Sequence, residues 1–370
     1  MENQNTFIQK IIFGSPGTGK SYRIRELAQY QLDIKFNPVR NTLENTVKTV
    51  FHPEYTYSDF MGKLLPLSYG TSVVYKYYPG HFLQALGMAY QGLIKAKQQN
   101  YLLVIDELNR GNAAAIFGSI FQLLDREIDG WSTYEIDISE MEIVGLLNVM
   151  EYKANISSNG TLQINDSSYE VFFKILEQDL KQSLNKDGFR LLENLRVRKI
   201  LLPPNLSIIG TINTSDESIY YLDSAFKRRW DWEYIDSPSK KNMYENIPAE
   251  IAYASLPIED KFLDWDRCIV GVNEFIKSHQ HIVRRIEDKQ IGWWFIKPKN
   301  GEVTIEQVQD KLMFYLWDGV FVRNKQVLVK FIEDKLGKTN VTLVTFSDFL
   351  FYTAELLEYW HDSVPNNTDS

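Results

Sequence analysis

The octapeptide Gly14–Ser21, GSPGTGKS, restricts the fold of this chain more than any other stretch. It follows the short apolar run Gln9–Phe13 and precedes residues 21–32, whose apolar side chains recur at helical spacing. The pattern G-x-x-x-x-G-K-[S/T] between a strand and a helix is typical of a phosphate-binding loop. Its glycines let backbone N–H groups point inward and surround phosphate oxygens, and the following helix places its positive N-terminal end at the same spot. A glycine-rich turn without a ligand is the alternative, which the flanking strand and helix disfavour.

The loop predicts a site for a nucleoside triphosphate with Mg²⁺. Lys20 would reach the β- and γ-phosphates, and the Ser21 hydroxyl would ligate the metal. The predicted nucleotide-binding residues are Gly14, Ser15, Pro16, Gly17, Thr18, Gly19, Lys20, Ser21 and, from a later segment, Asp216.

Apolar runs then alternate with amphipathic segments. Strands are predicted near residues 47–51, 102–108 and 205–213, with helices at 81–100 and 113–127. Residues 57–66 are predicted to form a short helix that Pro66 ends, and residues 72–80 a hairpin arm. Strands alternating with helices imply βαβ units, a parallel sheet and hence an α/β fold. Ligands of such sheets bind outside the carboxyl ends of the strands, where GSPGTGK, DELN and TINTSD would meet.

Two of these strand ends carry residues suited to phosphoryl transfer. Asp106 suits a contact with Mg²⁺, and Glu107 suits polarisation of an attacking water. Asn213 and Asp216 close the later strand, where an amide can sense the γ-phosphate and orient water. A solvated strand end and an ordinary Asn/Asp turn are the alternatives.

A basic cluster follows in the stretch LDSAFKRRW, which contains Lys227, Arg228 and Arg229. A guanidinium can neutralise charge on the transferring phosphoryl group, from the same subunit or from a neighbouring one. The alternative is a basic run on the surface.

Changes along the chain in the pattern of apolar and polar residues predict two domains and a tail. Residues 1–238 are predicted to form the nucleotide-binding α/β domain, interrupted by an insertion at about 131–199. Long amphipathic helices dominate residues 239–362, which are predicted to form a helical lid domain. Residues 363–370 are predicted to be a loose tail.

Composition excludes several classes of protein. The 370 residues include 48 acidic and 40 basic ones, so a chain of net charge −8 is a poor candidate for gripping DNA over its whole surface. The single cysteine, Cys268, allows no intrachain disulfide and fits a reducing cytoplasm. No apolar run approaches the ~20 residues that a membrane span needs. His279 and His281 lack partners at metal-ligand spacing.

Five stretches together resemble the AAA+ motor of McrB, the NTPase subunit of modification-dependent restriction systems. They are FGSPGTGKS, FHPEYTYSDFMGKLLP, YLLVIDELNRGNAAAIFGSIFQLLD, NLSIIGTINTSDESIYYLDSAFKRRWDW and IGWWFIKP, within residues 10–130 and 199–320. The resemblance implies a parallel five-stranded sheet flanked by helices and a C-terminal helical lid. It also implies Walker A at Gly14–Ser21, Walker B at Asp106 and Glu107, and sensor 1 at Asn213. Arg228 and Arg229 match paired arginines, one of which is expected to act across a subunit boundary.

The chain departs from the family pattern in three places. The hallmark MNTAD is INTSD here, and the IGHSYF-like stretch is IGWWF at Ile291–Phe295, which leaves the choice between GTP and ATP open. Only about ten residues precede the first strand, where the family usually carries a DNA-recognition domain. Recognition of the target is therefore expected in a separate subunit, such as a McrC-like nuclease.

The leading hypothesis is a cytoplasmic NTP-hydrolysing motor, a homo-oligomeric ring with six subunits expected, that drives DNA translocation or activates a McrC-like nuclease in antiviral defence. DNA would be contacted mainly through that partner. One alternative is a MoxR-like chaperone that remodels proteins, and another is a nucleotide-gated scaffold that hydrolyses little. The acids Asp137, Glu140 and Glu142 lack a nuclease lysine motif, so any cleavage is expected from a partner.

Overall fold

The computed structural model describes residues 7–70, 72–157, 159–180, 185–214, 220–242 and 247–365. They fall into two compact units. The first lies within Met1–Ile12, Ser21–Ile212 and Ser218–Glu233, and the second within Phe13–Lys20, Asn213–Glu217 and Tyr234–Ser370. Most of the glycine-rich loop is therefore grouped with the C-terminal part of the chain.

A five-stranded sheet with the order β14–β1–β13–β7–β4 forms the centre of the first unit. Its strands are β1 (Gln9–Gly14), β4 (Thr46–Val50), β7 (Tyr101–Asp106), β13 (Leu206–Asn213) and β14 (Asp231–Tyr234). β7 pairs in parallel with both neighbours, Gly210 opposite Ile105 and Val50 opposite Asp106.

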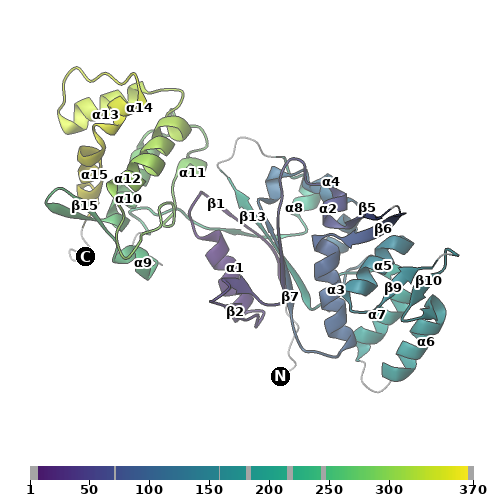
Figure 1. Ribbon diagram of the computed structural model, residues 1–370. Coiled ribbons are helices and arrows are strands. Elements are labelled where there is room, and N and C mark those ends of the chain that lie inside the picture. Colours follow the sequence, from purple (N-terminus) through teal and green to yellow (C-terminus); the bar gives the residue numbers. More distant parts are fainter. Residues whose placement is uncertain are drawn as a thin grey trace. The chain divides into compact units, whose positions relative to one another are not determined.

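Helices cover both faces of this sheet. α1 (Lys20–Tyr30) lies on one face and α3 (His81–Ile94) on the other (Figure 1). β7 and β13 are consequently buried almost throughout, which explains their continuous apolar sequences. α1 buries Ile24, Leu27 and Ala28, the helical spacing that the sequence indicates. The predicted α/β fold, with a five-stranded sheet flanked by helices, is confirmed.

The segment after β4 differs from its prediction. α2 spans only Tyr57–Phe60, and β5 (Gly62–Tyr69) pairs antiparallel with β6 (Ser72–Pro79). The short helix predicted to end at Pro66 stops at Phe60 instead, and its predicted second half is wrong because Pro66 lies within β5. A strand of a two-stranded hairpin has one unpaired edge, where a residue without an N–H is tolerated.

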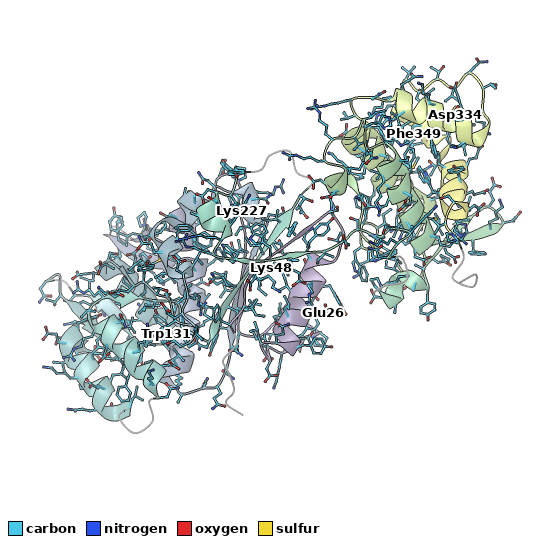
Figure 2. The ribbon with its side chains drawn as sticks, turned by 180° about the vertical axis from the view of Figure 1, so that it is seen from behind. Glu26, Lys48, Trp131, Lys227, Asp334 and Phe349 are labelled. Carbon is cyan, nitrogen blue, oxygen red and sulfur yellow. The ribbon has the colours of Figure 1, made fainter. Side chains whose placement is uncertain are left out.

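The region of residues 131–200, which precedes β13, belongs to the first unit. It contains α5 (Glu140–Val149), α6 (Tyr169–Leu180), α7 (Lys186–Arg196), the three-stranded sheet of β9 (Ala154–Ile156), β10 (Leu162–Ile164) and β11 (Ser167–Ser168), and the paired strands β8 (Ile136–Asp137) and β12 (Lys199–Ile200). The buried indole of Trp131 (Figure 2) donates its Nε1–H to Asp187 Oδ1 at 2.8 Å. This bond ties the start of the region to α7.

Short elements complete the first unit. They are β2 (Phe36–Asn37), β3 (Thr42–Leu43), α4 (Ala113–Phe117), α8 (Ser224–Lys227) and the 3₁₀ segments Leu108–Arg110 and Gly118–Leu124.

The second unit is mainly helical. Its elements are α9 (Ala249–Ala252), β15 (Ser255–Ile258), β16 (Lys261–Asp264), α10 (Trp265–Ser278), α11 (Ile286–Lys289), α12 (Ile305–Gln307) with the π-helical segments Val308–Met313 and Tyr315–Val320, α13 (Gln326–Leu336), α14 (Phe346–Leu350) and α15 (Thr353–Asp362). Trp265, Phe349 and Trp360 are buried in its core. Across the described ranges, no helix is long and apolar enough to cross a bilayer.

Candidate functional site

The glycine-rich loop connects the end of β1 to the first turn of α1. The Lys20 ammonium donates to the carbonyl oxygens of Gly14 at 2.8 Å and Ser15 at 3.0 Å. The Thr18 hydroxyl also donates to the Ser15 carbonyl, at 2.9 Å. Because α1 begins at Lys20, the N–H groups of its first turn, which have no acceptor within the helix, border the same loop. A fixed ammonium beside a helix N-terminus suits an anion such as a phosphate.

The segment Ile291–Phe295, hereafter the strap, lies directly against this loop. The Gly292 N–H donates to the Pro16 carbonyl at 2.9 Å, and the Trp294 N–H donates to the Gly17 carbonyl at 2.8 Å. A Cβ added to Gly292 would lie 2.2 Å from the carbonyl carbon of Gly17. The backbones therefore approach too closely for any residue but glycine at position 292.

A buried asparagine holds the strap in place. Asn273 of α10 accepts from the Ile291 N–H at 2.8 Å and donates to the Ile291 carbonyl at 2.8 Å. It also donates to the Pro238 carbonyl at 2.8 Å, and its side chain is fully buried. Asn273 was not predicted from the sequence, although an Asn within the apolar stretch CIVGVNEF is a usable signal. Satisfied buried amides of this kind fix backbone segments.

We expect Gly292→Ala to weaken nucleotide binding about tenfold or more, because overpacking against a backbone costs roughly 1–3 kcal/mol. Titration with a fluorescent nucleotide analogue measures the effect. Gly337→Asn is the matched control: nothing lies within 4 Å of the added Cβ, and Asn tolerates the φ of 66° at that position. Wild-type affinity in Gly292→Ala would show that the strap does not shape the loop.

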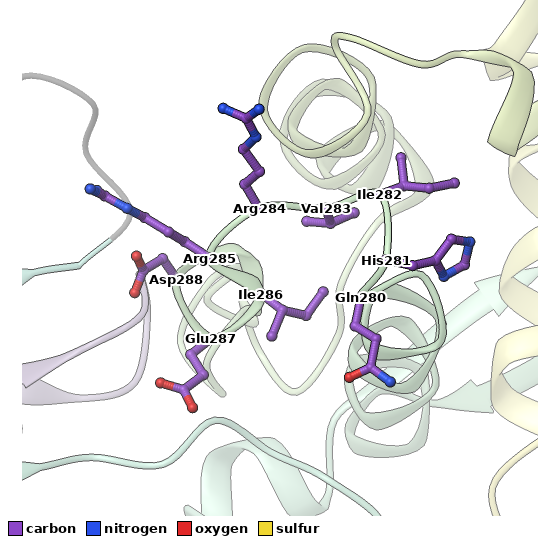
Figure 3. A pocket seen from close by; sticks show the side chains of 9 residues that line it. All are labelled: Gln280, His281, Ile282, Val283, Arg284, Arg285, Ile286, Glu287 and Asp288. Atoms are coloured by element: carbon purple, nitrogen blue, oxygen red, sulfur yellow. The ribbon is translucent and has the colours of Figure 1, made fainter.

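The loop Gln280–Asp288 also contacts the glycine-rich loop. The Ser15 hydroxyl donates to the Glu287 carbonyl at 2.5 Å. Burial raises the pKa of the Asp288 carboxyl, although a hydrogen bond from the Thr214 side chain acts in the opposite direction. Residues Gln280–Asp288 line a cavity, and the side chains of Arg285 and Asp288 extend to the same side of it (Figure 3). These polar groups were not found from the sequence, because no motif marks them.

The acidic part of the site lies at the carboxyl end of β7. Asp106 accepts from the Thr211 hydroxyl of β13 at 3.0 Å and pairs with the Lys48 ammonium of β4 at 2.6 Å. Glu107 follows with a left-handed φ of 55°, and its N–H donates to Thr211 Oγ1 at 3.3 Å. A non-glycine residue in this conformation is uncommon and is often found at functional sites.

The residues available for Mg²⁺ fit that ion. Asp106 already holds a cation, the Lys48 ammonium, and Ser21 presents an exposed hydroxyl at the start of α1. Mg²⁺ usually takes one or two protein ligands together with substrate phosphates and waters. No group of three His, Cys, Asp or Glu side chains within the described residues could hold a metal by itself. These residues therefore suit a metal that binds together with a triphosphate better than a metal held by protein side chains alone.

Asn213 is the last residue of β13, the strand between β1 and β7. Asp216 lies outside the described residues. The sheet order thus makes neighbours of the three strands whose ends carry the glycine-rich loop, Asn213 and Asp106.

The two arginines have different surroundings. Arg229 donates to Asp125 Oδ2 at 2.6 and 3.1 Å and to the Ala225 carbonyl at 2.7 Å, and its guanidinium lies 4.0 Å from the centre of the Phe121 ring. Its side chain is only 9% exposed. Arg228 is exposed, and its guanidinium has no hydrogen-bond or ion-pair partner among the residues that the structure describes. Of the pair, only Arg228 is available to another molecule.

Curated restriction proteins are similar to this chain. The Type II restriction enzyme BsuMI component YdiS of Bacillus subtilis (strain 168) is 28% identical over 342 residues, 86% of this chain and 80% of that protein. The Type IV methyl-directed restriction enzyme EcoKMcrB subunit of Escherichia coli (strain K12) is 26% identical over 252 residues, 66% of this chain and 39% of that protein. These similarities confirm that the chain resembles McrB-like proteins of restriction systems.

Other comparisons add little. No protein-family model matches the chain. A solved structure from Cytophaga hutchinsonii covers 74% of this chain and 58% of its own at 12% identity, with a TM-score of 0.25, a value too low to define a shared fold. The matched region spans less than half of the Escherichia coli subunit.

Proposed function

We propose that this McrB-like chain is the NTP-hydrolysing motor of a restriction complex and that it works as a cytoplasmic homo-oligomeric ring, with six subunits expected. The observation that carries the proposal is the adjacency of β1, β13 and β7 in one sheet. Their ends bear the glycine-rich loop, Asn213 and the Asp106–Glu107 pair. Phosphoryl transfer from a nucleoside triphosphate requires a loop that binds the phosphates, an amide that orients water and an acidic pair.

Each group has a role in this proposal. The backbone of Gly14–Ser21 binds the phosphates, and the Lys20 ammonium neutralises charge on the β- and γ-phosphates. Asp106 and Ser21 would hold Mg²⁺, which supplies charge neutralisation and alignment of the phosphates when bound. Glu107 accepts a proton from the attacking water, and Asn213 orients that water. Arg228 stabilises charge on the transferring group in the site of the adjacent subunit.

The base of the nucleotide is proposed to be guanine or adenine. Trp294 is the strap residue proposed to contact the base. Its ring lies 3.4 Å from a Cβ placed on Gly19, within the phosphate loop. A partly exposed indole beside the phosphate loop can stack on either purine. The proposal therefore keeps both GTP and ATP as substrates.

The energy of hydrolysis is proposed to drive DNA translocation or to activate a McrC-like nuclease. In the part of the chain that the structure describes, no cluster of acidic and histidine side chains could hold a nuclease metal by itself, so cleavage is assigned to that partner. DNA is assigned mainly to the partner too, since the chain has a net charge of −8.

A turnover assay tests the proposed function. Phosphate release is measured with GTP and with ATP, each with Mg²⁺, alone and after addition of DNA and the candidate nuclease. Hydrolysis of at least one nucleotide, increased by the nuclease or by DNA, is the expected result. Nucleotide binding without hydrolysis under every condition would contradict it and would favour a scaffold. Stimulation by a protein substrate alone would favour a chaperone.

A further inference from the structure

The cation on Asp106 is a lysine that the predicted site does not include. Lys48 lies on β4, the edge strand beside β7, and its Nζ is 2.6 Å from Asp106 Oδ2. Figure 2 shows Lys48 beside the central strands of the sheet. The pair therefore places a positive charge on the carboxylate that is the candidate metal ligand.

The two partners differ in their freedom to move. The Lys48 side chain is 56% exposed, whereas that of Asp106 is only 17% exposed. Asp106 is also fixed by the Thr211 hydroxyl at 3.0 Å. An exposed lysine stem can leave its partner with little loss of stability, because exposed ion pairs contribute little. The carboxylate thus stays in place while its cation is exchangeable.

We propose that Lys48 is the counter-ion that a divalent metal has to displace from Asp106, so that it lowers the affinity of this site for metal without nucleotide. An ammonium and a divalent cation repel each other when they share one carboxylate. This inference rests on the proposed function, because it takes Asp106 as the metal ligand.

The exchange has a direct consequence for the order of binding. Without nucleotide, the ion pair already satisfies Asp106, and a free divalent cation gains little by replacing Lys48. A triphosphate brings negative charge that attracts the metal and offers the released ammonium a new partner. Lys48 therefore favours loading of the metal together with the nucleotide.

Binding of Mn²⁺ alone to the nucleotide-free chain tests the inference, with the free ion followed by its paramagnetic resonance signal. Lys48→Gln is expected to bind Mn²⁺ about threefold to tenfold more tightly than wild type. Lys48→Arg, which keeps the charge, is expected to behave as wild type. A second readout is the Mn²⁺ concentration at which thermal stability rises, which should be lower for Lys48→Gln.

Lys63→Gln is the matched control. Lys63 also pairs with a carboxylate of the same unit, Asp59 at 2.9 Å, and is 48% exposed. Its removal should leave Mn²⁺ binding unchanged, whereas Asp106→Asn should abolish it. Wild-type affinity in Lys48→Gln, or no binding by it at millimolar Mn²⁺, overturns the role of Lys48. Undiminished binding in Asp106→Asn overturns the metal assignment itself, so the two failures are distinguishable without any hydrolysis assay.

Discussion

Arg228→Ala is expected to bind nucleotide as wild type does and to hydrolyse it about 10³-fold more slowly. The physical reason is the exposure of Arg228, whose guanidinium has no ion pair within the described ranges and can reach a neighbouring molecule. An arginine that stabilises charge only during phosphoryl transfer affects kcat and leaves ground-state binding unchanged. Equilibrium binding and steady-state hydrolysis, measured on the assembled protein, separate the two quantities.

Arg229→Ala provides the contrast. It removes two bonds to Asp125, one bond to the Ala225 carbonyl and the contact with the Phe121 ring. We expect a loss of about 2 kcal/mol in the free energy of unfolding, since hydrogen bonds to charged groups are worth roughly 1.5–3 kcal/mol. If Arg228→Ala hydrolyses normally while Arg229→Ala is stable and inactive, the assignment of the two arginines is reversed.

Glu107→Gln is expected to bind nucleotide tightly and to lower kcat about 10²- to 10⁴-fold, because the amide cannot accept the proton of the attacking water. The substitution is close to isosteric, so the left-handed backbone at position 107 need not change. Persistence of unhydrolysed nucleotide after gel filtration measures the trapped state. We also expect this variant to favour the assembled ring. Rapid turnover by Glu107→Gln would remove Glu107 from the mechanism.

Mixing the two inactive variants tests whether sites are shared between subunits. A site that takes Glu107 from an Arg228→Ala subunit and Arg228 from a Glu107→Gln subunit is complete. Hydrolysis should therefore return in the mixture, although each variant alone is inactive. An inactive mixture would mean that Arg228 acts within its own subunit.

The core of the fold could be predicted from the sequence because its signals are local. β7 and β13 are buried on both faces, which requires continuous apolar runs that are visible in the sequence. The second half of the helix predicted to end at Pro66 was wrong, because a contact between separate segments decides the structure there. The stretch YSDFMGKLLP satisfies the helical pattern weakly, and pairing of β5 with β6 overrides it.

The candidate site likewise contains residues that could be predicted from local motifs and residues that could not. The loop Gly14–Ser21 and the Asp106–Glu107 pair are contiguous motifs, so their positions at the ends of β1 and β7 could be predicted. Lys48 and Asp125 could not, because each acts on a residue that is distant along the chain. The distinction between Arg228 and Arg229 depends on Asp125, 104 residues before its partner. No periodicity or spacing records such a contact.

The strap has a consequence for how nucleotide preference can change. Its hold on the loop comes from main-chain N–H groups of Gly292 and Trp294, and a side chain at position 294 can be exchanged without losing either bond. Under the proposed function, substitutions at position 294 would alter the surface beside the base while the phosphate cradle stays intact. Gly292 does not share that freedom, because an added Cβ would meet the backbone of Gly17. Substitutions in the strap could in this sense change the preference for a base without changing phosphate binding, although the same short segment contributes to both.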